Sequence, residues 1–219
     1  MIRAIIFDLD GVICSTDDYH FEAWKALADS LGLSFDRKKN DRLRGVSRMA
    51  SLEIVLEESQ ISYTPEEKQA MAEKENEIYK ALLCNVRPSD CFPGVRETLQ
   101  ALKDREVKIA IGSSSKNTKN ILTRLELIDA FDAIADGTDV THSKPDPEVF
   151  LCAAGKLGIS PSECAVVEDA SAGIQAAKAA GMLAVAFGGD ACTDPRADVV
   201  ITKPQQLLDL ANVCGDAIC

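Results

Sequence analysis

Two pairs of acidic residues are the side chains of this sequence best suited to chemistry. Asp8 and Asp10 follow one short apolar run, and Glu168 and Asp169 follow another. Two residues apart on an extended chain, Asp8 and Asp10 point the same way, and two such carboxylates repel unless a cation or a proton lies between them. Hard oxygen ligands of this kind suit magnesium. The pattern therefore predicts a Mg²⁺ site with Asp8, Asp10, Glu168 and Asp169 as its metal ligands.

The same residues, together with a lysine and a serine, predict phosphoryl transfer. Asp8 can attack phosphorus, because aspartyl phosphates are established covalent intermediates. Asp10 is placed to protonate the leaving oxygen and later to deprotonate the acceptor. Lys144 supplies positive charge, and Ser113 a hydroxyl, to the transferring oxygens. We therefore expect four catalytic residues, Asp8, Asp10, Ser113 and Lys144.

Each of these signals has a simpler explanation when it is taken alone. An Asp-x-Asp pair is often a helix cap or a solvated loop end, and Lys144-Pro145 suits an ordinary turn. Glu168 and Asp169 could cap the helix expected over 170–180. Their joint occurrence after successive apolar runs favours a shared site over these alternatives.

The apolar runs that precede these residues predict a parallel sheet. Short buried strands are expected at 3–7, 107–111, 130–135, 164–167, 183–187 and 199–201. Helical segments separate the later strands, near 94–104, 116–127, 147–157, 170–180 and 204–212. Such alternation implies an α/β fold with right-handed crossovers and helices on both faces. Chemistry gathers at the carboxyl ends of the strands in this architecture, which is where the polar clusters fall.

A helical insert separates the first strand from the rest. Apolar residues recur at helical spacing between about Asp17 and Pro88, and no strand is expected there. Thr64 before Pro65 is typical of a helix start, with threonine as the cap and proline at the first helical position. We therefore expect a catalytic α/β core formed by residues 1–15 and 89–219, and a helical cap domain formed by residues 16–88.

Composition excludes several classes of partner. The formal net charge of −11 argues against nucleic acid, because binding its backbone needs clustered positive charge. No segment is long and apolar enough to span a membrane, and no cleavable apolar leader is evident, so we expect a cytoplasmic protein. The eight cysteines lack metal-binding spacing, and we expect them to be reduced and mostly buried, with Cys214 and Cys219 exposed.

The ordered motifs resemble those of the haloacid dehalogenase superfamily. Asp8-Leu9-Asp10-Gly11-Val12 matches its first motif, Ser113 its second, Lys144 its third, and Glu168-Asp169 its fourth. The resemblance implies a Rossmann-like core, magnesium and an aspartyl-phosphate intermediate, with the insert as a helical cap. Asp10 is the acid that phosphatases and phosphomutases of this superfamily carry and that the dehalogenases proper lack.

Within that superfamily the chain resembles the β-phosphoglucomutase family. That family carries a Gly-Val-Ser-Arg run in the cap, here residues 45–48, and a Ser-Lys-Asn run after the second motif, here residues 115–117. It interconverts β-glucose 1-phosphate and glucose 6-phosphate through β-glucose 1,6-bisphosphate. The resemblance implies a substrate-binding set of Thr16, His20, Trp24, Arg44, Gly45, Val46, Ser47, Arg48, Asn76, Ser115, Lys116 and Asn117. In that set Arg48, Ser115 and Asn117 hold the phosphate that is not transferred, and Thr16 and His20 link substrate binding to Asp10.

Two departures and several alternatives remain open. The family carries lysine where this chain has Arg44, and an Arg-Lys-Asn run where it has Lys74-Glu75-Asn76. These changes bear on the sugar preference. Arg48 and Lys116 could be solvated charges, Trp24 part of the cap core, and His20 an incidental surface residue. The main alternative function is that of a phosphatase acting on sugar phosphates or phosphoglycolate. A receiver-like signalling module is a second, remote alternative. The family resemblance implies a monomer.

Overall fold

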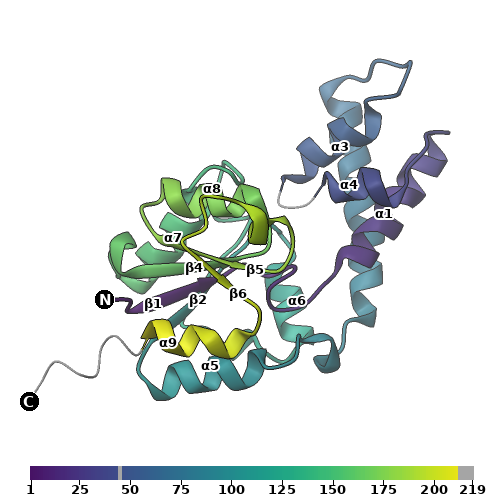
Figure 1. The fold of residues 1–219 in the computed structure, drawn as a ribbon. Coiled ribbons are helices and arrows are strands. Elements are labelled where there is room, and N and C mark those ends of the chain that lie inside the picture. Colours follow the sequence, from purple (N-terminus) through teal and green to yellow (C-terminus); the bar gives the residue numbers. More distant parts are fainter. Residues whose placement is uncertain (44–45, 212–219) are drawn as a thin grey trace, which may run out of the picture. The chain divides into compact units, whose positions relative to one another are not determined.

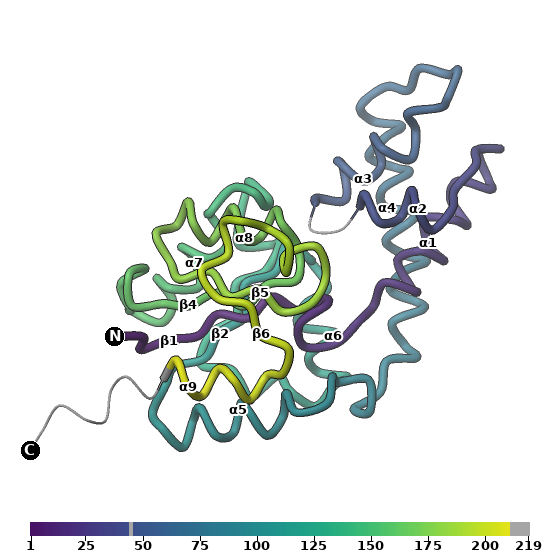
Figure 2. The backbone as a smooth tube through the Cα atoms, viewed as in Figure 1, coloured from purple at the N-terminus to yellow at the C-terminus, as the bar shows by residue number. Residues whose placement is uncertain are grey.

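A computed structural model describes residues 1–43 and 46–211 of the chain. Arg44 and Gly45, and the expected exposed thiols Cys214 and Cys219, lie outside the described residues. Contacts divide the chain into two compact units. Unit 1 consists of residues 1–15 and 87–219, and unit 2 of residues 16–86. The chain therefore leaves unit 1 once and returns to it once, and Figure 2 traces this path.

Unit 1 is built on a parallel sheet of six strands in the order β3-β2-β1-β4-β5-β6. The strands are β1 (Ala4–Phe7), β2 (Lys108–Gly112), β3 (Ala133–Ala135), β4 (Cys164–Glu168), β5 (Leu183–Phe187) and β6 (Val199–Ile201). Every residue of the two central strands β1 and β4 is buried, which is why their sequences are nearly continuous apolar runs. The expected α/β parallel-sheet core is thus confirmed.

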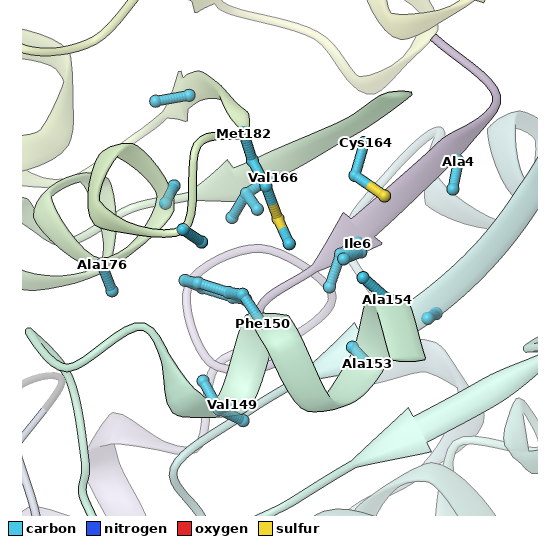
Figure 3. Packing of buried hydrophobic residues seen from close by; sticks show 14 of the residues in the cluster. Ala4, Ile6, Val149, Phe150, Ala153, Ala154, Cys164, Val166, Ala176 and Met182 are labelled. Carbon is cyan, nitrogen blue, oxygen red and sulfur yellow. The ribbon is translucent and has the colours of Figure 1, made fainter. Parts of the chain in front are cut away.

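Helices cover both faces of the sheet (Figure 1). They are α5 (Val95–Asp104), α6 (Thr118–Arg124), α7 (Glu148–Leu157), α8 (Ser171–Ala179) and α9 (Leu207–Ala211). Helices α7 and α8 pack on one face, where Phe150 meets Ile6, Val166 and Met182 in the apolar cluster of Figure 3. Short 3₁₀ turns occupy Leu83–Asn85, Pro88–Asp90, Ile128–Ala130, Pro161–Glu163, Asp190–Thr193 and Pro204–Gln206. The strand expected at 130–135 is shorter than predicted: Ala130 ends a 3₁₀ turn, and the strand begins only at Ala133.

Unit 2 contains only helices in its described residues. They are α1 (Asp17–Ser30), α2 (Arg37–Asp41), α3 (Arg48–Leu56) and α4 (Pro65–Leu82), followed by the first 3₁₀ turn. Helix α4 begins as predicted, because the Thr64 hydroxyl accepts from the Glu67 amide and the Glu67 carboxylate accepts from the Thr64 amide. The insert is therefore all-helical over the part that the structure describes.

The buried face of α4 differs from the one that the apolar residues indicate. Helical spacing favours Met71, Ile78, Leu82 and Leu83; the first three are only half-buried, and the buried Leu83 lies in the 3₁₀ turn after α4. The buried residues of the helix are Ala72, Glu75 and Tyr79. One carboxylate and one phenol thus lie inside unit 2, and both become part of the polar group described below.

The structure also tests the expectations for the cysteines and for membrane-spanning helices. All six cysteines within 1–211 are free. Only Cys14 and Cys164 are buried, and Cys84 is exposed, so the expectation of mostly buried thiols is wrong for this set. Among the helices of the described residues, none combines the length and apolar character needed to cross a bilayer.

Candidate active site

Strand register brings three of the predicted site residues, Asp8, Ser113 and Glu168, to one edge of the sheet. Phe7 of β1 lies opposite Ile111 of β2 and Val167 of β4, so the residues that follow these strands emerge together. The backbone amide of Asp8 donates to the Val167 carbonyl at 3.0 Å. The strand order reverses between β1 and β4, and ligands bind at such switch points in open α/β sheets. Asp8 and Glu168 flank this point.

Lys144 is buried between the carboxylates of Asp8 and Glu168. Its ammonium donates to Asp8 Oδ1 and to Glu168 Oε1, and it lies 4.7 Å from the centre of the Phe150 ring. Only 4% of Lys144 is exposed. A solvated turn would leave this side chain in water, so the structure does not support the alternative in which Lys144-Pro145 is an ordinary surface turn.

Burial and neighbouring charges shift the pKa values of this pair. Burial by itself lowers the pKa of Lys144, but the carboxylates of Asp8 and Glu168 outweigh it and raise that pKa. Burial raises the pKa of Asp8 well above its ordinary value; Lys144 opposes this rise, and Glu168 and Asp169 add to it. The ammonium is therefore held charged, while Asp8 is a carboxylate whose negative charge lacks full compensation.

Three carboxylates at this edge form a group that can hold a metal ion. Oxygens of Asp8, Glu168 and Asp169 all lie within 4.8 Å of one another. With the Lys144 ammonium beside Asp8 and Glu168, three acidic groups face one cation, a formal net charge of −2 when all three acids are ionised. Buried charge of this size requires compensation, and hard oxygen donors suit a divalent cation. These residues therefore fit a divalent metal ion.

Asp10 stands apart from this acidic group. Its carboxylate is not among the oxygens that converge, although the sequence predicts it as a ligand. Asp10 lies in a tight loop. Its backbone pairs with that of Cys14 in an isolated β-bridge, and the Gly11 amide donates to the Cys14 carbonyl at 2.7 Å. Alternation on an extended strand does not apply once the chain turns, so Asp8 and Asp10 need not point to one metal.

Three glycines surround Glu168 and Asp169, and sequence reasoning missed their role. A Cβ on Gly11 would lie 2.1 Å from Asp169 Oδ2, and one on Gly173 would lie 1.9 Å from Glu168 Cδ. A Cβ on Gly189 would lie 2.0 Å from the Asp169 carbonyl oxygen. Side chains at these positions would displace the two acids. Gly11 falls inside the first motif and was therefore detectable, whereas Gly173 and Gly189 have no local signal.

The structure does not support the helix-cap alternative for Glu168 and Asp169, because the N-cap of α8 is Ala170 and no side chain caps it. Glu168 Oε2 accepts from the amides of Asp169 and Ala170, each at 3.1 Å. However, the first amide of α8, that of Ser171, donates to Asp190 Oδ1 at 2.9 Å. Glu168 thus orders the loop with one oxygen and contacts Lys144 with the other.

The loop after β2 orders itself through serine side chains. Ser113 Oγ accepts from the Ser115 amide, and Ser115 Oγ accepts from the Asn117 amide, both at 3.2 Å. Ser113 and Asn117 are buried, and Lys116 is exposed. The loop therefore presents a run of polar groups directly after the carboxyl end of β2.

Several predicted substrate-binding residues of unit 2 form a second polar group. The Thr16 hydroxyl is 2.7 Å from the Tyr79 hydroxyl, and the His20 ring stacks on Tyr79 with its centroid 3.8 Å away. Arg48 Nε donates to Glu75 Oε2 at 2.7 Å. We call Thr16, His20, Arg48, Glu75 and Tyr79 the unit 2 polar group. The sequence singled out Thr16, His20 and Arg48 but missed Tyr79.

A spacing rule could have found Tyr79. Thr16 and His20 are four residues apart, as are Glu75 and Tyr79, and residues four apart share one face of a helix. Two such pairs on two packed helices can meet. The signal is weak because many polar pairs share this spacing.

The other predicted residues of unit 2 lie outside this group. Trp24 is 3% exposed and belongs to the apolar core with Leu27 and Leu52, so it has almost no surface for a substrate. Ser47 caps α3, because its hydroxyl accepts from the Ala50 amide at 3.2 Å. Val46 and Asn76 are half-buried, and Arg44 and Gly45 lie outside the described residues.

Comparison with known proteins agrees with this geometry. A profile of the haloacid dehalogenase-like hydrolases matches residues 2–181. The β-phosphoglucomutase of Bacillus subtilis is 47% identical over 189 residues, which cover 85% of this chain and 84% of that protein. A phosphorylated carbohydrates phosphatase of Thermotoga maritima is 31% identical over 95% of this chain and 98% of its own.

A solved structure gives the same result for the fold. The crystal structure of a β-phosphoglucomutase from Clostridium difficile superposes with a TM-score of 0.90 at 39% identity, covering 97% of this chain and 98% of that one. The match thus extends over both the α/β unit and the helical insert. The chain belongs to the haloacid dehalogenase-like hydrolase family and, within it, to the β-phosphoglucomutases.

Proposed function

We propose that the protein is a phosphomutase that interconverts β-glucose 1-phosphate and glucose 6-phosphate through β-glucose 1,6-bisphosphate. One observation carries the choice of reaction: the 47% identity with the β-phosphoglucomutase of Bacillus subtilis over most of both chains. The site supports it, because Asp8 lies at the switch point of the sheet with a buried ammonium beside it.

The first half-reaction moves a phosphoryl group from a sugar to the protein. A carboxylate oxygen of Asp8 forms a bond to phosphorus while the bond from phosphorus to the departing oxygen breaks. Asp10 gives that oxygen its proton. Lys144 stabilises the negative charge that gathers on the phosphoryl oxygens, and the Ser113 hydroxyl donates to one of them.

The second half-reaction reverses these roles toward a different sugar hydroxyl. Asp10 takes the proton of that hydroxyl, its oxygen attacks phosphorus, and the Asp8 carboxylate leaves. We propose Mg²⁺ as the cation held by Asp8, Glu168 and Asp169; when bound, it screens negative charge around the phosphoryl group. The net charge of −2 in this group supports a divalent ion.

A mutase must also hold the phosphate that does not react. From the resemblance to the β-phosphoglucomutases, we propose that Arg48, Ser115, Lys116 and Asn117 contact that phosphate; a guanidinium fork, an ammonium, a hydroxyl and an amide are donors that suit a phosphate. Thr16 and His20 are proposed to contact the sugar side of the site. We leave Trp24 out of the binding set because it is buried in the core of unit 2.

Hydrolysis is the alternative reaction, and two observations favour it. Glu75 places an acid where the β-phosphoglucomutase family carries a lysine, and phosphatases are among the relatives. Water would then replace the sugar hydroxyl in the second half-reaction.

A coupled assay separates the two reactions. The protein is incubated with β-glucose 1-phosphate, Mg²⁺ and a trace of β-glucose 1,6-bisphosphate, and glucose 6-phosphate and inorganic phosphate are both followed. Rapid glucose 6-phosphate that depends on the bisphosphate supports the mutase. Stoichiometric inorganic phosphate without glucose 6-phosphate contradicts it.

A monomeric, cytoplasmic protein remains our prediction from the sequence.

A further inference from the structure

Glu75 is a buried carboxylate that no catalytic step above uses. It lies in α4 of unit 2, and its side chain is 0% exposed. A charged carboxylate placed away from water costs several kcal/mol unless it is paired and hydrogen-bonded. What its two oxygens contact therefore indicates why an acid is kept at this position.

Oxygen Oε2 holds Arg48 by one atom. Arg48 Nε donates to Glu75 Oε2 at 2.7 Å, which fixes the plane of the guanidinium. Residues 1–43 and 46–211 supply no hydrogen-bond partner for Nη1 and Nη2 of Arg48, and a fifth of its side chain is exposed. The two terminal nitrogens are thus the edge that can engage a phosphate in a bidentate manner.

Oxygen Oε1 has no hydrogen-bond partner within the described residues. Unsatisfied buried acceptors are rare in native proteins and call for an explanation. The ring nitrogen Nδ1 of His20 lies 3.8 Å from this oxygen, beyond hydrogen-bond distance. A ring movement of about 1 Å would bring Nδ1–H into range of Oε1.

The stacking of His20 on Tyr79 permits such a small movement of the ring. Its ring stacks on Tyr79 with an interplanar angle of 14°, so it can slide along that face without losing the contact. The Tyr79 hydroxyl is fixed in turn by the Thr16 hydroxyl at 2.7 Å. The His20 side chain is 29% exposed, which leaves its far edge accessible.

We propose that Glu75 is a positioning residue that orients both Arg48 and His20 for substrate. One oxygen sets the guanidinium plane. The other accepts from Nδ1–H of His20, which fixes the tautomer in which Nε2 is an acceptor for a sugar hydroxyl. The substrate part of this proposal rests on the proposed function, but the orientation of the two side chains does not.

The tautomer of His20 gives a readout that a merely structural ion pair would not move. The chain has only two histidines, so a His142→Gln background leaves one imidazole. Nitrogen-15 NMR of the neutral imidazole then reports which ring nitrogen carries the proton. We expect the proton on Nδ1 of His20 in that background.

Glu75→Gln should reverse this tautomer. Because Arg48 Nε can only donate, the amide oxygen of the new side chain faces Arg48 and its NH₂ faces His20. Nδ1 then becomes an acceptor and the proton moves to Nε2. Glu77→Gln, an exposed position on the same helix, is the matched control and should leave the proton on Nδ1. The same tautomer in the Glu75→Gln and control proteins would overturn the proposal.

Kinetics test the link to Arg48 separately. Glu75→Ala should raise KM for β-glucose 1-phosphate about tenfold with a smaller change in kcat, because a misplaced guanidinium loses charged hydrogen bonds to the phosphate. Added to Arg48→Ala, the same change should cost less than on its own, since both act on one contact. Fully additive losses contradict the proposal. If the protein only hydrolyses sugar phosphates, the proposed function fails, and the NMR result still decides the role of Glu75.

Discussion

The two polar groups of this protein differ in their balance of charge and in their construction. At the strand ends of unit 1, three carboxylates converge on one ammonium, so the group carries excess negative charge. In unit 2, one buried carboxylate pairs with one guanidinium, so the acid is balanced, and the two terminal nitrogens of Arg48 remain available to other partners. The first arrangement suits a cation, and the second suits an anion.

This difference follows from the architecture of each unit. Parallel strands deliver loop residues from distant parts of the chain to one edge, which concentrates acids around Lys144. Packed helices instead bring a face of one helix against a face of another, so that Thr16 and His20 both meet Tyr79 of α4. A phosphomutase differs from a phosphatase in needing a second site, one that binds the phosphate that does not react.

Asp8→Asn tests the unit 1 group most severely. The amide cannot attack phosphorus, so we expect transfer to fall by at least about 10⁴-fold, while unit 2 is unaffected. The coupled assay measures the loss, and phosphorylated protein should no longer be detected by mass spectrometry. Turnover near that of the wild type would remove Asp8 as nucleophile.

Lys144→Met tests whether the ammonium stabilises the acidic group. Removing the cation leaves the Asp8 and Glu168 carboxylates buried without compensation, so we expect the free energy of unfolding to drop by about 3 kcal/mol. Turnover should fall by about 10²- to 10³-fold because an oxyanion donor is lost. Urea unfolding in metal-free buffer measures the first effect. Lys178→Met, which removes an exposed ion pair with Asp198, is the control and should change stability by less than about 1 kcal/mol.

Arg48→Ala tests the anionic role of the unit 2 group. We expect mutase turnover to fall by about 10²-fold, because charged hydrogen bonds to the second phosphate are lost. Hydrolysis of a small aryl phosphate, which has no second phosphate, should change little. Equal loss in both assays would show that Arg48 has no selective role.

Gly173→Ala tests the space that the metal group needs. A Cβ there would meet Glu168, so we expect Mg²⁺ affinity to fall by about tenfold in isothermal titration. Gly155→Ala is the matched control: this glycine is also helical, but a Cβ on it would touch nothing within 4 Å. The control should stabilise the fold by about 0.5 to 1 kcal/mol and leave Mg²⁺ binding unchanged.

The smallest expected effect is a pH dependence of stability in metal-free buffer. Because burial raises the pKa of Asp8, the folded protein binds a proton at a higher pH than the unfolded chain does. Stability should therefore decrease as pH rises from about 4 toward the raised pKa. At neutral pH, Asp8→Asn should be more stable than the wild type, and this gap should close at low pH. A gap that does not vary with pH in urea unfolding would contradict the raised pKa.

Much of the fold could be predicted because local patterns act independently of the rest of the chain. The apolar runs of β1 and β4 indicate buried strands, and Thr64 with Pro65 indicates the start of α4. The face of α4 could not be predicted in the same way. Its apolar residues indicated one stripe, but packing buried Glu75 and Tyr79, which contact Arg48 and Thr16 on other segments of the chain.

The sequence alone determined which residues can do the chemistry: Asp8, Ser113, Lys144 and Glu168 each follow or precede an element whose pattern is local. Only the tertiary structure decided which of these side chains are in contact. It placed Lys144 between Asp8 and Glu168, left Asp10 outside the acidic group, and put glycines where the two acids need room. The physical reason is that strand order and the packing of turns depend on contacts between distant segments, which no local pattern encodes.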